Sequence, residues 1–174
     1  MSVTPVLQPF IAGWAAHQRL LLAAIADLSR EQLALRPAPA AWTIWQLASH
    51  MAGSRAYWMH DVLGEGDPAI RDLFRVTTTT VPDLPLENAG WEDNESQPRT
   101  ADEIVDAFKV TWSVVEACLG RWTSDDITVQ IPQRGADRHT TRGWVIWHLM
   151  EHEAHHGGAI SIALGANSLP GLDL

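Results

Sequence analysis

Histidines recur at a spacing of four near the C-terminal end of the chain, where the sequence reads WHLMEHEAHHGGAISIALG. His148, His152 and His156 lie on one face of a helix there, because each step of four residues rotates by only about 40° around the axis. Residues four apart have Cβ atoms about 5–6 Å apart, so two imidazoles can bind one metal ion at about 2.0–2.1 Å. His148 and His156 are separated by about 12 Å of helical rise, so only one adjacent pair can share an ion.

The pair His152 and His156 is the better candidate for metal binding. Both continue an apolar stripe of the same helix and are therefore predicted to point at the core. His155 is rotated by about 60° from His152, which predicts a place at the rim of the site. A third ligand is expected from a facing helix, and His50 is the natural candidate because it falls on the inward face of a predicted helix. Three histidines and a water form a catalytic type of metal site.

The alternative interpretation is that these residues are structural histidines. A buried imidazole needs a hydrogen-bond partner, and two on one apolar stripe are harder to satisfy than one. Spacing alone leaves both roles open. It also does not identify the metal, because three histidines suit Zn, Ni, Cu or Fe; of these we expect a divalent ion, zinc or nickel.

The same segment matches the zinc-protease pattern H-E-x-x-H, with His152 and His156 as ligands and Glu153 as general base. We discount a protease, because no glutamate follows Glu153 to act as a further ligand. The extended form of the motif fails too, since Ala159 and Ile162 occupy the positions of its last glycine and histidine. Glu153 is also rotated by about 100° from His152, which predicts that it faces away from the apolar stripe.

Four long helices are predicted to position these residues. The first covers residues 7–28, the second covers 43–63, the third starts near residue 100, and the last covers 141–164. Capping boxes mark two of the starts, with Thr43 and Gln46 in one and Thr100 and Glu103 in the other. Gly165 is the expected C-cap of the last helix.

The segment between the second and third helices, residues 64–99, is long, poorly periodic and rich in Pro, Thr and acidic residues. We expect one short helix in it, at residues 70–74. A connection this long predicts a crossover, so the fold class is an all-α four-helix bundle with helices two and three parallel. Residues 127–131 predict a short strand. A chain of 174 residues can bury one sizeable core, so residues 1–174 are expected to form a single domain.

Composition narrows the classes of function. Hydrophobic residues make up 46% of the chain and charged residues 19%, which argues against disorder. The net charge of -9 argues against nucleic acid as a partner, because phosphate binding needs clustered Lys and Arg. The single cysteine, Cys118, excludes an internal disulfide. With no signal-peptide pattern and no membrane-span stretch, we expect a cytoplasmic protein with a small-molecule substrate.

The segments AAWTIWQLASHMAGSRAYW and TRGWVIWHLMEHEAHHGGAISIALG, with the tail LPGLDL, resemble the DinB/YfiT-like family of bacterial metalloenzymes. The resemblance covers nearly the whole chain. It implies a four-helix bundle with one metal-binding histidine on helix two and two, four apart, on the last helix. The matching positions are His50, His152 and His156. Some relatives are S-transferases and isomerases that use a low-molecular-weight thiol such as bacillithiol or mycothiol. The resemblance therefore implies a metal-dependent thiol S-transferase, and relatives also imply a homodimer.

In such an enzyme, His155 or Tyr57 would assist proton transfer. Arg55 and Arg142 would bind a carboxylate of the thiol cofactor. The plainer interpretation is that the first two residues are packing or rim residues and that the arginines are solvated. Two other functions stay open: a hydrolase that uses metal-bound hydroxide, and a non-catalytic metal-binding protein of a stress response. The fourth coordination position separates an enzyme from a structural site, because a fourth protein ligand would close it.

Overall fold

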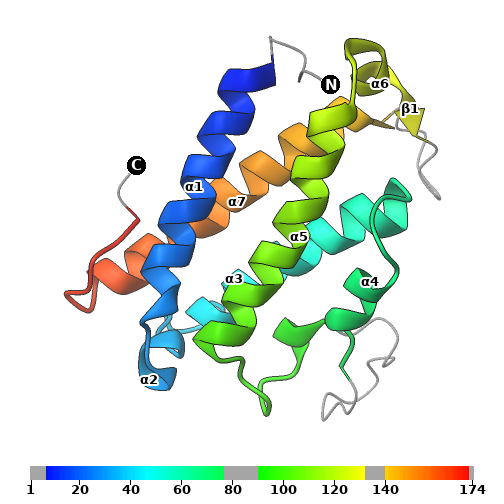
Figure 1. Ribbon diagram of the computed structural model, residues 1–174. Helices are drawn as coiled ribbons and strands as arrows, with labels where there is room; N and C mark the ends of the chain where they lie inside the picture. Colours follow the sequence, from blue (N-terminus) through cyan, green and yellow to red (C-terminus); the bar gives the residue numbers. More distant parts are fainter. Residues whose placement is uncertain (1–6, 77–89, 132–139, 173–174) are drawn as a thin grey trace.

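Four long helices form a bundle in the computed structural model of the chain (Figure 1). The structure describes residues 7–76, 90–131 and 140–172. The long helices are α1 (Gln8–Ala26), α3 (Ile44–Ala56), α5 (Ala101–Arg121) and α7 (Arg142–Gly165). In Figure 1, α1 and α5 lie in front of α3 and α7, and α3 and α5 run in the same general direction. Contacts join α3 to both α5 and α7, and α1 to α5. The all-α bundle with a crossover between its second and third long helices is thus confirmed.

Shorter elements connect the long helices. They are α2 (Arg30–Leu33), the π-helical turn η2 (Tyr57–Val62), α4 (Ala69–Leu73), the 3-10 turn η4 (Trp91–Asp93), α6 (Ser124–Thr128), β1 (Gln130–Ile131) and β2 (Thr140–Thr141). The short helix predicted in the crossover is present as α4, and residues 77–89 of that segment lie outside the described residues. The strand predicted at 127–131 is wrong over most of its length. Thr123 caps α6 by accepting from the Asp126 N–H, and only residues 130 and 131 pair, antiparallel, with β2.

Both predicted capping boxes are formed. The Thr43 hydroxyl accepts from the Gln46 N–H, and the Gln46 side chain accepts from the Thr43 N–H at 3.0 Å. Thr100 and Glu103 make the same pair of bonds at the start of α5. A cap of this kind stabilises a helix by about 1 kcal/mol. It also fixes the residue at which α3 begins, which sets the direction in which His50 points.

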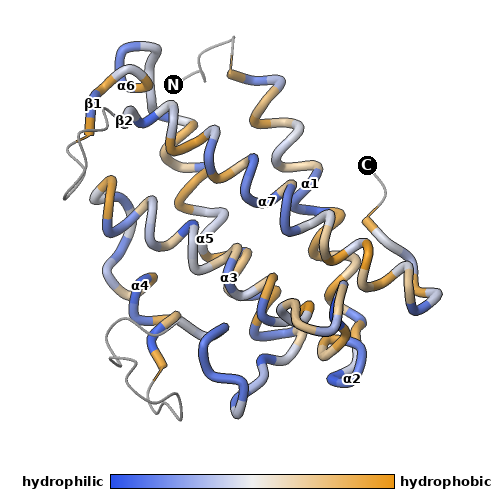
Figure 2. Tube along the Cα trace, turned by 180° about the vertical axis from the view of Figure 1, so that it is seen from behind, coloured by the Kyte–Doolittle hydropathy of each residue, from blue (hydrophilic) through white to orange (hydrophobic). Residues whose placement is uncertain are grey.

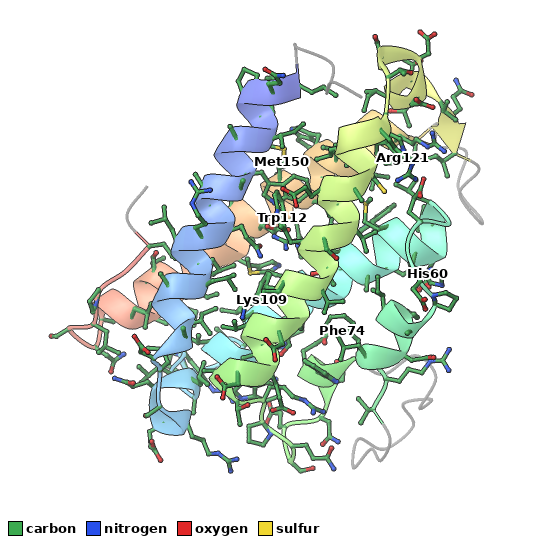
Figure 3. All side chains as sticks on the ribbon, in the orientation of Figure 1. His60, Phe74, Lys109, Trp112, Arg121 and Met150 are labelled. Carbon is green, nitrogen blue, oxygen red and sulfur yellow. The ribbon has the colours of Figure 1, made fainter. Side chains whose placement is uncertain are left out.

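The core contains two apolar clusters that follow one another along the bundle. Buried polar side chains lie between them, one from each long helix, and we call these four residues the polar layer. They are Gln18, Arg55, Thr111 and Glu153, with exposed fractions of 4%, 0%, 1% and 0%. Trp112 of α5 packs edge-on against Trp14 of α1 beside the layer, with ring centroids 5.4 Å apart (Figure 3).

The middle of α7 is hydrophilic between more apolar ends, as the colouring of Figure 2 shows. This stretch carries the clustered histidines and Glu153. Over the described ranges, every helix is too short or too polar to cross a lipid bilayer. Glu151 and His155 of this stretch are exposed to solvent, whereas Glu153 is fully buried and His152 and His156 are half-buried.

Candidate metal centre

Three imidazoles meet where α3 faces α7. The Nε2 atom of His152 lies 3.0 Å from Nε2 of His50 and 3.2 Å from Nε2 of His156. One ring nitrogen of each of the three lies within 4.8 Å of the other two, and all three residues are half-buried. The structure thus brings together the three residues that the spacing and the resemblance selected. Their role as metal ligands stays a prediction.

The three rings fit a divalent cation better than they fit one another. A ring nitrogen carries either one N–H or one lone pair, so Nε2 of His152 cannot donate to one neighbour and accept from the other. A cation accepts a lone pair from all three. With metal–nitrogen bonds of about 2.0–2.1 Å, neighbouring ligand nitrogens are separated by about 2.9 Å in octahedral and about 3.4 Å in tetrahedral geometry. Two of the three separations, from His152 to His50 and to His156, are 3.0 and 3.2 Å and lie within this interval, and the third pair, His50 and His156, is within 4.8 Å.

The electrostatics of the cluster keep the two α7 histidines, His152 and His156, uncharged. Burial, followed by the neighbouring rings of His156 and His50, lowers the pKa of His152 to about 3. Burial, followed by His50 and His155, lowers the pKa of His156 to about 4. Both rings are therefore neutral near pH 7, which is the form that binds a metal.

Two residues that the sequence analysis missed surround His50. Glu92, in η4, lies with Oε1 3.2 Å from the His50 Nδ1. Trp42 packs edge-on against the His50 ring, at a centroid distance of 4.9 Å. A carboxylate on Nδ1 fixes the tautomer of a metal-binding histidine and makes it a stronger ligand. Nδ1 of His152, by contrast, is buried without a hydrogen-bond partner among the described residues.

The inward face of α7 differs from the predicted one. Val145, Leu149, Glu153 and Ile160 are all fully buried, whereas His152 and His156 lie half-buried at the edge of this stripe. The prediction that Glu153 faces away from the core is therefore wrong. Its position is only about 40° from that of Leu149. The rejection of a protease base is supported for a different reason: both oxygens of Glu153 are occupied by hydrogen bonds inside the core.

Arg55 has a different partner from the one predicted. Its side chain is fully buried, and its Nε and Nη2 donate to the two oxygens of Glu153 at 2.5 and 2.6 Å. Such a fork uses the guanidinium edge that would bind a carboxylate of a cofactor. This burial corrects the prediction that Arg55 binds a thiol cofactor. It also corrects the alternative interpretation that Arg55 is solvated.

The other predicted residues lie at different distances from the three rings. Tyr57, the first residue of η2, is 48% exposed and lines a cleft together with His50. His155 is exposed, and its ring centroid lies 5.1 Å from that of His156. Arg142 starts α7, about 15 Å of helical rise from His152. It pairs there with Asp126 at 3.2 Å, so the structure does not bring it to the histidines.

The cleft beside His50 has a volume of about 220 Å³. Its lining comprises His50, Gly53, Ser54, Tyr57, Arg71, Phe74, Gly90, Glu92 and Asp93. Arg71 pairs with Asp61 at 2.8 Å, while the Tyr57 ring packs edge-on against Trp58. The cleft therefore offers a small molecule a mixed polar and aromatic wall next to one of the three imidazoles.

The chain is a crossover four-helix bundle whose three convergent imidazoles could bind a divalent metal ion between facing helices, as helical bundles with metal sites do. Residues 1–166 match the sequence model of the DinB family. The chain belongs to the DinB family, which confirms the resemblance found in the sequence.

Two solved structures share the fold. A crystal structure of a DinB-like protein from Bacillus cereus ATCC 10987 has a TM-score of 0.66 and 20% identity, over 100% of this chain and 99% of that chain. A conserved protein from Enterococcus faecalis has a TM-score of 0.68 and 13% identity, over 95% of this chain and 99% of that one. At such identities these likenesses show the fold alone. No curated protein matches the chain.

Proposed function

We propose that the chain is a metal-dependent thiol S-transferase that binds one divalent cation, zinc or nickel, on His50, His152 and His156. The observation that carries the proposal is the convergence of three imidazoles, with Nε2 of His152 3.0 Å from that of His50 and 3.2 Å from that of His156, beside a cleft of about 220 Å³ that His50 lines. Three protein ligands leave a coordination position open, as catalytic sites require. The family resemblance supports a thiol as the molecule that uses this position.

When bound, the cation would lower the pKa of a thiol and so favour the thiolate near neutral pH. Glu92 keeps the His50 ring in place through the contact at Nδ1. In the transfer, the thiol loses its proton to His155, at the rim beside His156. The sulfur then forms a bond to an electrophilic carbon, and the leaving group departs with the bonding electron pair. The Tyr57 hydroxyl, in the wall of the cleft, donates a proton to that leaving group.

The first experiment is elemental analysis of protein purified without a metal-affinity tag. We expect about one zinc or nickel ion per chain, and loss of the ion in a His152→Ala variant. Ile162→Ala, on the exposed face of α7, is the matched control and keeps the metal. The proposed site is refuted if wild-type protein contains no divalent metal after purification and also binds none when it is titrated with zinc or nickel.

The second experiment tests the reaction. Bacillithiol, mycothiol and glutathione are each offered with a chromogenic electrophile, with and without a chelator. We expect a rate above background for at least one thiol, abolished by the chelator and by His152→Ala. A thiol should also shift the visible spectrum of the cobalt-substituted protein. Ester hydrolysis that needs the metal and no thiol would favour the hydrolase, and metal binding without any turnover would favour the non-catalytic role.

A further inference from the structure

The polar layer joins all four long helices at the level of the histidines. Glu153 of α7 accepts from Arg55 of α3 at 2.5 and 2.6 Å, and its Oε2 also accepts from the Trp14 Nε1 of α1 at 2.8 Å. Gln18 of α1 donates to the Phe108 carbonyl of α5 at 3.3 Å. These bonds cross the core between two apolar clusters, where a layer of apolar side chains would otherwise be expected.

Arg55 also packs against aromatic rings of two other helices. Its guanidinium carbon lies 5.6, 5.0 and 5.4 Å from the ring centroids of Trp14, Phe108 and Trp112. Its Nη1 donates to the Phe108 carbonyl at 3.5 Å. The side chain is therefore held by the two bonds to Glu153 and packed against aromatic rings of α1 and α5.

Stability alone is a poor explanation for a charged pair in this position. Buried ion pairs can often be replaced by apolar residues of similar volume without loss of stability. What they supply instead, in the best-attested cases, is register, since a polar contact in a core forms at only one relative setting of the helices. A guanidinium–carboxylate fork is especially selective, because both of its bonds must align at once.

The geometry ties this register to the histidines. Glu153 directly follows His152 on α7, and Arg55 lies about 7.5 Å of helical rise beyond His50 on α3. The fork and the imidazole cluster thus span the same two helices. A shift of α7 along α3 by one residue, about 1.5 Å, would break the fork and separate the Nε2 atoms together.

We propose that the polar layer, centred on Arg55 and Glu153, is a positioning device that fixes α7 against α3 and so brings His50 to His152 and His156. The proposal rests on the metal site proposed above, and Arg55 and Glu153 are positioning residues that do not touch substrate. If the pair served only the stability of the fold, its replacement would change the geometry of the three histidines only by destabilising the fold. The proposal instead predicts that this geometry can change while the fold stays stable.

The test replaces the pair by neutral side chains of similar size, Arg55→Met with Glu153→Gln, which keeps an acceptor for Trp14. We expect the metal-free double variant to fold cooperatively, with the metal affinity lowered at least tenfold by chelator competition and the cobalt spectrum altered. The matched control makes the same changes, Arg121→Met with Glu65→Gln, in the ion pair between α5 and the segment that follows η2. We expect the control to keep wild-type affinity and spectrum.

Wild-type affinity and spectrum in the folded double variant overturn the proposal. If that variant does not fold, Arg55→Lys serves instead, because lysine keeps the charge but cannot form the fork. A folded Arg55→Lys protein with wild-type affinity overturns the proposal equally. If wild-type protein binds no metal, the proposed function fails, but the positioning role of the polar layer can still be tested. Crystal structures of the metal-free wild-type protein and of the metal-free variants then provide the test. We then expect the His50–His152 Nε2 separation to exceed the wild-type 3.0 Å in the variants, and an unchanged separation overturns the proposal.

Discussion

Removal of Arg55 alone should destabilise the fold far more than removal of the whole pair. In Arg55→Met the carboxylate of Glu153 stays fully buried and keeps only Trp14 as a partner. Breaking a buried pair in this way costs about 3–5 kcal/mol, because one charge is left uncompensated. For a domain of this size, each kcal/mol lowers the melting temperature by about 2–4 °C, so we expect a fall of roughly 6–20 °C.

Urea unfolding of metal-free protein near pH 7, followed by circular dichroism, measures the effect. We expect Arg55→Met to lower the unfolding midpoint with an unchanged m value, and the added Glu153→Gln change to recover at least half of the loss. Lys109→Met is the control, since Lys109 and Asp106 pair at 3.5 Å with side chains 63% and 75% exposed. An exposed pair contributes about 0–1 kcal/mol. A loss below about 1 kcal/mol in Arg55→Met, or no recovery in the double variant, would refute the reasoning.

Two further predictions concern the proposed metal ligands. Glu92→Ala removes the carboxylate 3.2 Å from the His50 Nδ1 and should weaken metal binding about 10–100-fold, as measured by chelator competition. Glu95→Ala, at a side chain 67% exposed, is the control and should keep the wild-type affinity. Equal metal affinities of the two variants would contradict the prediction. The pKa values of His152 and His156, lowered to about 3 and about 4 from 6.5, make the unfolded chain bind more protons than the metal-free fold as pH falls below 6.5. The free energy of unfolding should therefore decrease from about pH 7 to about pH 5, and a urea midpoint that is level or higher at pH 5 would contradict the assignment.

The parts of the fold that depend on local sequence could be predicted. The starts of α3 and α5 follow from capping boxes, which involve residues only three positions apart. The proximity of His152 and His156 on α7 could be predicted from the helical period. The position of His50 opposite them could be predicted because it falls on the inward face of α3. Glu92 could not be found in this way. It lies in a long aperiodic connection, and only the folded crossover brings it to His50.

The burial of Glu153 could not be predicted for a related reason. A carboxylate in a core is costly without a counter-charge, so an isolated reading of α7 places it outside. Its counter-charge is Arg55, which is 98 positions away in the chain. The sequence of either helix considered alone predicts that its charged residue is exposed, and the burial of each is explained by the other. Pairs of this kind become visible only when two helix faces are compared together.

The residues of the pattern H-E-x-x-H in α7 lie in two different surroundings, because the helix rotates between them. In a zinc protease the glutamate must reach the water on the metal, so it needs a free oxygen beside the ligands. Here both oxygens of Glu153 accept hydrogen bonds from Arg55 and Trp14 in the fully buried core, while His152 and His156 lie half-buried at its edge. The edge position leaves these imidazoles half-buried and next to His50, which lines the cleft, and the core position gives the carboxylate a fully buried partner on α3, Arg55. Neighbouring residues of one helix can therefore serve the proposed metal ligation and the proposed helix register at once, because about 100° of rotation directs them to different surroundings.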